Sequence, residues 1–155
     1  MCAVVALDVR NAFNSASWEL ILEEMAAIGM PQYIYNIINS YLQDRCIILT
    51  DAEGGVVVKK VTGGVPQGSI LGPTLWNILY DGVLRLELGD GAQLIGFADD
   101  LALVVSAKKE AELMAITNVA LQKISAWMKQ KRLHLAPEKT EAIVLSGRRK
   151  LSEIC

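Results

Sequence analysis

The chain has 155 residues and a mass of 16.9 kDa, which is the usual size of one domain. Its 52% hydrophobic content, 21% charged content and mean hydropathy of +0.33 exclude a disordered chain. Its apolar runs are shorter than the roughly 18 residues of a membrane-spanning helix, so we expect a globular domain with no membrane partner. Three widely spaced cysteines without a CxxC pair indicate neither a disulfide framework nor a zinc site, and they fit a reducing, intracellular compartment. We recognise no targeting signal.

Charge is unevenly distributed along the chain. Residues 1 to 107 hold 5 basic and 12 acidic side chains, whereas residues 108 to 155 hold 10 basic and 5 acidic ones. The net charge of -2 argues mildly against a nucleic-acid partner, but this asymmetry is typical of an acidic centre beside a basic flank. Solvated faces of ordinary helices would produce the same asymmetry, so charge alone leaves both interpretations open.

The first part of the chain is predicted to form a strand, two helices and a hairpin. An apolar run that ends at Asp8 predicts the strand, and apolar residues at helical spacing predict the helices. Two β-type runs around Glu53-Gly54-Gly55 predict the hairpin. These elements are expected at Cys2–Leu7, from the N-cap Ser17 to Gly29, from Pro31 to about Leu42, and at Cys46–Thr50 with Val56–Thr62.

The second part begins with a glycine-rich loop, residues 63 to 73, whose four glycines permit close backbone approach. A helix is expected to follow it, and then a tight hairpin with Asp99-Asp100 at its tip. A long amphipathic helix and a last strand complete the chain. The expected ranges are Pro73 to Leu86, Ala92 to Ala98, Leu101 to Ala107, Leu113 to Met128 and Glu141 to Ser146.

The order of these elements predicts the fold class. When residues 17 to 62 are set apart as an inserted helix pair and β-hairpin, the order is β-α-β-β-α-β, which predicts an α+β, ferredoxin-like (split βαβ) sandwich. In that topology the third strand lies antiparallel between the first and the second. Asp8 and the Asp99-Asp100 turn should therefore lie at one end of the sheet, within one or two strand spacings of ~4.8 Å.

Three carboxylates gathered in this way predict a metal site. Each close pair repels by roughly 4 kcal/mol at an effective dielectric constant near 20, and the stretch from Ala92 to Ala107 contains no Lys or Arg. Carboxylate oxygens suit Mg²⁺, or Mn²⁺ in its place, and two such ions support phosphoryl transfer. Each acid alone is explained as readily by a strand end or a turn, but their joint placement favours a site.

Four segments carry a resemblance to a known family. In chain order they are Ala6–Ser15 (ALDVRNAFNS), Gly64–Pro73 (GVPQGSILGP), Phe97–Asp100 (FADD) and Leu135–Glu141 (LAPEKTE). In order and spacing they resemble the palm motifs of reverse transcriptases, most closely those of non-LTR (LINE-type) retrotransposons. The resemblance extends from Ala3 to about Arg149. It implies an RNA-directed DNA polymerase that uses two Mg²⁺ (or Mn²⁺) ions, an RNA template, a DNA primer and deoxynucleoside triphosphates.

The resemblance also implies roles for individual residues around the metal ions. By position, Asp8 and Asp99 resemble the principal metal ligands, and Asp100 resembles the second acid of the hairpin. The backbone carbonyl of Val9 resembles an auxiliary metal ligand. Lys139 resembles the lysine that protonates the leaving pyrophosphate, and a cation there would stabilise phosphate charge even without proton transfer. A solvated loop lysine is the alternative for Lys139.

Other residues resemble nucleotide and nucleic-acid contacts of the family. Phe13 resembles the bulky residue beneath the incoming sugar, where a ring would clash with a 2'-hydroxyl and select deoxynucleotides. Gln67, between Pro66 and Gly68, resembles the glutamine that contacts the incoming nucleotide. The residues expected to touch template or primer phosphate are Arg148, Arg149 and Lys150, for which a fraying basic tail is the alternative.

The resemblance implies a fragment of a longer protein. Residues 1–147 are expected to be the palm, with the inserted module at about 17–62, and residues 148–155 to be a basic tail toward a thumb. The fingers and thumb of the full-length protein, expected in the nucleus, would lie outside this chain, so we expect no activity from the fragment alone. Ala136 stands where many relatives have asparagine, which makes its surroundings less polar.

Three other interpretations compete with the polymerase. An RRM-type RNA-binding domain has the same topology but requires an aromatic-rich strand that this sequence lacks. A nucleotide cyclase also uses paired acids, but the Pro66-Gln67-Gly68 turn favours the polymerase. The last alternative is a domesticated or inactive retroelement remnant that binds RNA or another protein.

Overall fold

The computed structural model describes residues 1–146, so the predicted contacts of Arg148, Arg149 and Lys150 lie outside the described residues. The chain divides into two compact units, Met1–Ala12 with the chain from Tyr80 onward, and Phe13–Leu79. The range 17 to 62 that the sequence set apart lies within the second unit. No helix of residues 1–146 is long and apolar enough to cross a membrane.

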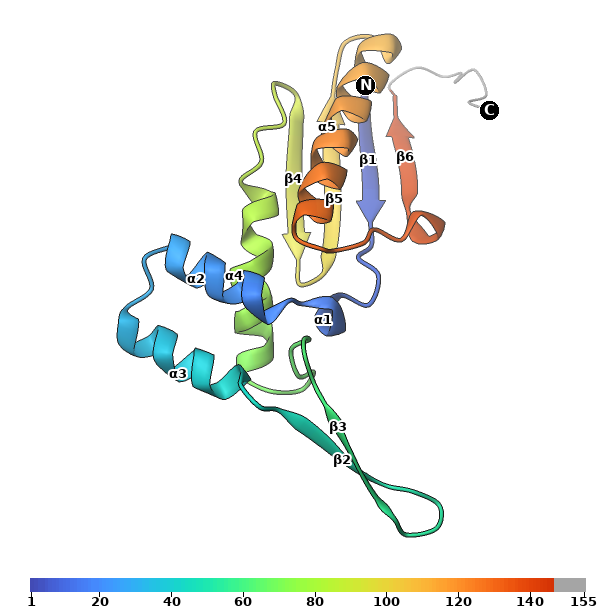
Figure 1. Cartoon of the computed structure of the whole chain (residues 1–155). Coiled ribbons are helices and arrows are strands. Elements are labelled where there is room, and N and C mark those ends of the chain that lie inside the picture. Colours follow the sequence, from blue (N-terminus) through green and yellow to red (C-terminus); the bar gives the residue numbers. More distant parts are fainter. Residues whose placement is uncertain (147–155) are drawn as a thin grey trace. The chain divides into compact units, whose positions relative to one another are not determined.

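The first unit is built on a four-stranded sheet in the order β4-β5-β1-β6, in which every neighbouring pair is antiparallel. The third strand of this sheet in sequence therefore lies between the first and the second, as the sequence predicted. Helix α5 contacts β1, β4 and β5 (Figure 1). The strands and helices of this unit are β1 (Cys2–Leu7), β4 (Ala92–Phe97), β5 (Asp100–Ser106), α5 (Glu110–Gln130), the 3₁₀ turn η1 (Pro137–Lys139) and β6 (Glu141–Leu145).

Alternation along the strands decides which face of this sheet is buried. Successive strand residues point to opposite faces, and the apolar set on one face packs beneath α5. That buried set is Ala3, Val5, Leu7, Leu101, Leu103 and Val105 on the strands, with Leu113, Ala120, Ile124 and Met128 on α5. The acids that flank the strands are therefore displayed on the opposite, open face.

The turn between β4 and β5 differs from the prediction. The last pair of the ladder is Phe97 with Asp100, so Asp100 belongs to β5 and the two-residue loop is Ala98-Asp99. Ala98 has a φ of 55°, and such short hairpin loops require a positive φ at their first residue. Only one of the two acids is thus at the tip, and the other is held by the sheet.

The second unit contains helices and a two-stranded hairpin. Ser17 caps its helix as predicted, because its hydroxyl oxygen accepts a hydrogen bond from the backbone N–H of Leu20 at 3.5 Å. Both strands of the hairpin are exposed along their whole length. The elements are α1 (Ala12–Ser15), which starts in the first unit, α2 (Trp18–Ala27), α3 (Gln32–Leu42), β2 (Cys46–Thr50) and β3 (Val56–Lys60).

Helix α4 (Leu71–Leu84) links the two units along the chain. It begins and ends two residues earlier than the range predicted from the sequence. Ser69 explains the early start, because its hydroxyl accepts a hydrogen bond from the backbone N–H of Gly72 at 2.9 Å, as an N-cap does. Pro73 then lies within the first turn, where its missing N–H costs nothing.

Candidate functional site

The acids of the first unit meet at one end of its sheet. Leu7 of β1 pairs with Leu101 of β5, and the residues next to this pair along the two strands are Asp8 and Asp100. Because Leu7 and Leu101 face the buried side, alternation directs Asp8 and Asp100 to the open face. Asp99 lies in the turn immediately before Asp100. The three acidic residues therefore lie at the edge that the strand order predicted.

The acids of this edge affect the pKa of a buried tyrosine, Tyr80. Tyr80 is only 3% exposed, and its ring packs edge to face on Trp127 with 6.1 Å between ring centroids. Burial raises the pKa of the Tyr80 hydroxyl well above its ordinary value, and the charges of Asp99, Asp100 and Asp8 raise it further. The three acids of this edge are thus the charged groups that act on this hydroxyl. Tyr80 thus remains a neutral phenol beneath the acidic edge.

Asp8 is held by the segment that precedes β6. Val9 forms an isolated antiparallel bridge with Leu135. The backbone N–H of Ala136 donates to the carbonyl of Asp8 at 2.9 Å, and the backbone N–H of Arg10 donates to the carbonyl of His134 at 2.7 Å. In this pattern the N–H and carbonyl of Val9 point away from Leu135. The Val9 carbonyl is thus left facing the other side of its segment.

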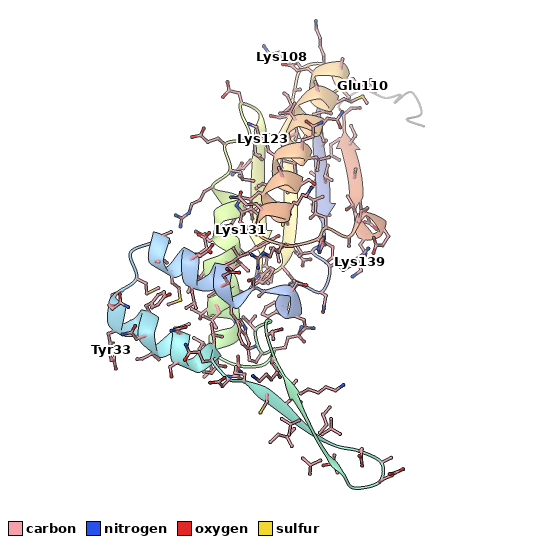
Figure 2. The ribbon with its side chains drawn as sticks, in the orientation of Figure 1. Tyr33, Lys108, Glu110, Lys123, Lys131 and Lys139 are labelled. Atoms are coloured by element: carbon pink, nitrogen blue, oxygen red, sulfur yellow. The ribbon has the colours of Figure 1, made fainter. Side chains whose placement is uncertain are left out.

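The carboxylate of Asp8 has one close cation. Its Oδ2 atom is buried and accepts no well-directed hydrogen bond from the described residues, yet the ammonium nitrogen of Lys139 lies 3.0 Å away. The Asp8 side chain is 25% exposed and that of Lys139 is 66% exposed. Lys139 is the last residue of η1, just before β6 (Figure 2). Charge, rather than a directed hydrogen bond, holds this pair.

The acidic edge fits a divalent ion by its donor chemistry. Its oxygens belong to carboxylates, which are the ligands that Mg²⁺ and Mn²⁺ prefer, and a buried carboxylate oxygen of Asp8 is free of directed hydrogen bonds among residues 1–146. Within that same range, however, no three His, Cys, Asp or Glu side chains gather closely enough to hold a metal ion as they stand. The ligand chemistry of these residues therefore suits a metal ion, but their side chains do not form a complete coordination site in this arrangement.

In the second unit, Phe13 rests on a buried tryptophan. Its ring stacks on that of Trp76 with 5.5 Å between centroids and 18° between ring planes. Trp76 is fully buried, and the backbone carbonyl of Phe13 accepts a hydrogen bond from Val65 at 2.7 Å. Helix α4 and the glycine-rich loop thus fix Phe13 from two directions.

The glycine-rich loop is held by its own backbone. The carbonyl of Pro66 accepts a hydrogen bond from the Ser69 hydroxyl at 2.8 Å. A Cβ on Gly72 would lie 2.3 Å from the same carbonyl, so no larger residue fits there without moving the loop. Gly68 has a φ of 77°, and both Gln67 and Gly68 are exposed. The loop therefore presents Gln67 on a defined backbone.

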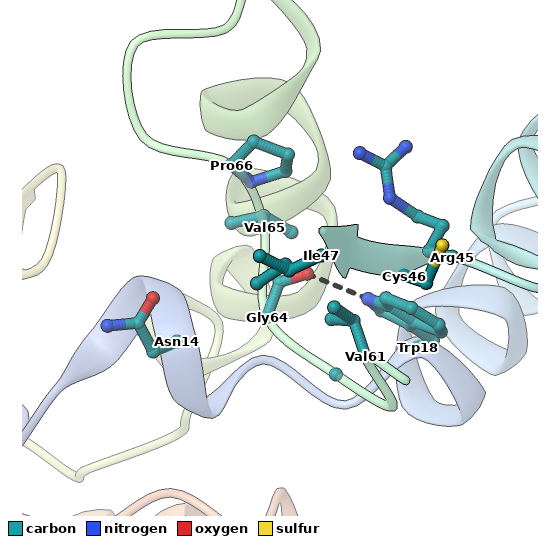
Figure 3. A pocket seen from close by; sticks show the side chains of 10 residues that line it. Asn14, Trp18, Arg45, Cys46, Ile47, Val61, Gly64, Val65 and Pro66 are labelled. Carbon is teal, nitrogen blue, oxygen red and sulfur yellow. Dashed lines mark hydrogen bonds between the residues drawn. The ribbon is translucent and has the colours of Figure 1, made fainter. Parts of the chain in front are cut away.

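A pocket of about 250 Å³ lies beside this loop (Figure 3). The indole Nε1 of Trp18 donates a 2.7 Å hydrogen bond to the carbonyl of Gly64 across it. A Cβ on Gly64, whose φ is 84°, would approach the backbone of Asn14 to 3.1 Å. Side chains from α1, α2 and β2 line the pocket together with Arg45 and Val61 at the base of the hairpin, and the Trp18 hydrogen bond holds the backbone just before Pro66.

Two features of the acidic edge escaped the sequence analysis. Phe97 is 82% exposed and faces the same side of the sheet as its partner Asp100. The alternation of side chains along the strand next to the acids could have indicated this exposed ring. Arg10 forms an ion pair with Glu138 at 2.8 Å, across 128 positions of sequence. No sequence signal pointed to that pair.

Comparisons with known proteins agree on one family. Residues 1–151 match the family model described as "Reverse transcriptase (RNA-dependent DNA polymerase)". Among curated relatives, the putative 115 kDa protein of the type-1 retrotransposable element R1DM of Drosophila melanogaster is 32% identical over 91% of this chain, which spans 13% of that protein. The probable RNA-directed DNA polymerase from transposon BS of the same organism is 27% identical over 90% of the chain, which spans 16% of that relative.

Solved structures agree on the fold. Apo telomerase from Candida tropicalis, truncated from its C-terminal domain, matches 97% of this chain with a TM-score of 0.75 at 19% identity, and the match covers 32% of that protein. Telomerase from Candida albicans in complex with a fragment of telomeric RNA matches 93% of the chain with a TM-score of 0.75 at 13% identity, over 28% of that protein. The mixed α+β fold with antiparallel sheets is thus shared with telomerase reverse transcriptase domains.

Proposed function

Because the chain belongs to the reverse transcriptase family and is related to the RNA-directed DNA polymerases of non-LTR retrotransposons, we propose that it is the catalytic palm of such an enzyme. In this proposal residues 1–147 form a ferredoxin-like palm that adds deoxynucleotides to a primer 3'-end on an RNA template. The observation that carries the proposal is the meeting of Asp8 with Asp99 and Asp100 at one end of the sheet.

Asp8, Asp99, Asp100 and the carbonyl of Val9 are the groups that would hold two divalent ions. When bound, such ions activate a 3'-hydroxyl and neutralise a leaving pyrophosphate. The chain itself contributes the orientation of the acids. The β1–β5 ladder fixes Asp100 opposite the end of β1, and the bridge at Val9 fixes the backbone of Asp8. Lys139 supplies positive charge at the same edge, where phosphate charge would develop.

The second unit supplies the residues for nucleotide selection. Gln67 is exposed on a loop whose backbone is fixed by Pro66, Ser69 and Gly72, which suits a contact with an incoming nucleotide. Phe13 is supported from below by Trp76, which suits a ring that must resist displacement by a 2'-hydroxyl. The exposed ring of Phe97 in the first unit adds a surface on which a base could stack.

Primer extension tests this proposal through one acid. In a chimera in which this chain replaces the matching region of the R1DM relative, Asp99→Asn should lower the rate of primer extension by about 10²- to 10³-fold, because a single preorganised electrostatic group contributes about that much. Asp90→Asn is the matched control, since Asp90 is an exposed acid in the turn before β4 and far along the strand from Asp99. Equal rates for Asp99→Asn and the unchanged chimera would refute the polymerase assignment of the acidic edge.

Sugar selection provides a separate prediction. In the same chimera, Phe13→Val should raise the rate of ribonucleotide incorporation relative to deoxynucleotides by about tenfold or more, since a smaller side chain leaves room for the 2'-hydroxyl. Deoxynucleotide incorporation should change much less because the cause is steric. Single-nucleotide incorporation with each sugar measures the ratio. An unchanged ratio removes Phe13 from the nucleotide site.

A further inference from the structure

Two ion pairs cross between the segment after β1 and the segment before β6. Asp8 Oδ2 lies 3.0 Å from the Lys139 ammonium, and the Arg10 guanidinium lies 2.8 Å from the carboxylate of Glu138. Asp8 and Arg10 belong to the segment after β1, and Glu138 and Lys139 to the segment before β6. Each segment therefore contributes one acid and one base. The backbone bridge at Val9 and Leu135 lies between the segments and sets their register.

The Asp8 pair is unlike an ordinary surface ion pair. The oxygen that faces Lys139 is buried, although the lysine itself is mostly exposed. The 3.0 Å contact with the Asp8 carboxylate and its negative charge raise the pKa of Lys139, so its ammonium remains charged. The backbone N–H of Glu138 lowers the pKa of its carboxylate most, and the charges of Arg10 and Lys139 lower that pKa further, so Glu138 stays ionised. The shifts of Lys139 and Glu138 thus favour the charged form of each.

We propose that the Lys139 ammonium is the resident counter-ion of Asp8, that a divalent ion must displace it from Oδ2, and that the Arg10–Glu138 pair holds Lys139 within reach of Asp8. This inference rests on the proposed function, because it takes Asp8 as a metal ligand. It assigns Lys139 a role before any nucleotide is bound. Arg10 and Glu138 are positioning residues, since they act through Lys139.

The geometry gives the displacement a physical basis. An ammonium 3.0 Å from a carboxylate oxygen occupies the side of that oxygen on which a second cation would bind, and two cations there repel each other. Lys139 has a long flexible stem and is mostly exposed, so it can leave Asp8 without unpacking the core. Its departure exposes Oδ2 to a metal ion while leaving positive charge close to the acidic edge.

Mn²⁺ binding by the 155-residue chain tests the inference, with free Mn²⁺ measured by electron paramagnetic resonance at neutral pH. Lys139→Gln should tighten Mn²⁺ binding by about threefold or more, as loss of a competing ion pair of this kind implies. Lys108→Gln removes the same charge from an exposed lysine at the other end of the first unit, as Figure 2 shows, and should change the affinity by less than about twofold. If the two variants change Mn²⁺ affinity equally, Lys139 acts only through its contribution to the net charge, and the inference is overturned.

The positioning role of Glu138 has its own readout. Glu138→Gln should tighten Mn²⁺ binding when Lys139 is present and have no effect in the Lys139→Gln background, because it acts only through Lys139. Additive effects of the two changes would overturn that role. Asp8→Asn separates this inference from the proposed function. If Asp8→Asn leaves Mn²⁺ affinity unchanged, the metal site is wrong and the inference falls with it. If Asp8→Asn weakens binding but Lys139→Gln binds as the unchanged chain does, only the inference is overturned.

Discussion

The 155-residue chain by itself is expected to extend a primer at least about 10⁵-fold more slowly than the R1DM chimera, even with its acids intact. Templated transfer requires a primer hydroxyl and a triphosphate held in near-attack geometry, and such positioning supplies roughly 7 to 11 kcal/mol of the barrier. The chain spans only 13% of the R1DM protein, so most of the surfaces that can hold the substrates belong to the rest of that protein.

Charge should weaken substrate binding further. The chain has a net charge of -2, and its acidic residues are concentrated in residues 1 to 107, where the proposed metal ligands lie. A polyanionic duplex is repelled by that part unless the basic residues after position 107 compensate, and such contacts weaken steeply with salt. Primer extension with Mg²⁺ or Mn²⁺ at low salt, run beside the chimera at equal concentration, measures the difference. A rate for the isolated chain within tenfold of the chimera would show that the chain positions its substrates unaided.

Trp76→Ala should destabilise the second unit by roughly 3–5 kcal/mol, the usual cost of removing a large buried aromatic side chain. Trp76 is fully buried on α4 and carries the stacked ring of Phe13, so its loss leaves a cavity beneath that ring. Urea denaturation followed by circular dichroism measures the change. In the chimera, the same substitution should also reduce discrimination against ribonucleotides, because Phe13 loses its support.

Two controls separate the role of Trp76 from general loss of aromatic surface. Trp76→Phe keeps a ring under Phe13 and should cost less than half as much as Trp76→Ala. Tyr33→Ala removes an aromatic ring that is 73% exposed on α3 of the same unit, and it should change stability by less than about 0.5 kcal/mol. A loss below about 1 kcal/mol for Trp76→Ala would mean that the Trp76 site collapses around the missing ring, and that Phe13 does not depend on it.

Most elements of this fold were predictable because their signals are local. Short apolar runs predicted β1 and β5, and Ser17 predicted the start of α2, where its hydroxyl accepts a hydrogen bond within the first turn. The order of elements then determined that the third strand of the sheet lies between the first and the second, because few chain paths satisfy antiparallel pairing. The convergence of Asp8 with Asp99 and Asp100 followed from that order alone.

Boundaries were less predictable because they depend on single hydrogen bonds and backbone angles. The sequence placed both acids at the tip of the β4–β5 turn, whereas the ladder continues to Asp100 and Ala98 adopts the positive φ of the loop. Alanine rarely adopts that conformation, so no residue preference indicated it. The start of α4 at Leu71 likewise depends on the Ser69 hydroxyl, which serves two backbone partners at once.

The sequence by itself determined the order of the strands, the acids at their ends and the motif spacing, because each is a property of neighbouring residues or of their order along the chain. The tertiary structure alone decided which side chains meet across long separations. It paired Lys139 with Asp8 and Glu138 with Arg10, and it placed Trp76 beneath Phe13. Such contacts depend on the reach of long side chains and on packing between segments, and neither leaves a periodic trace in the sequence.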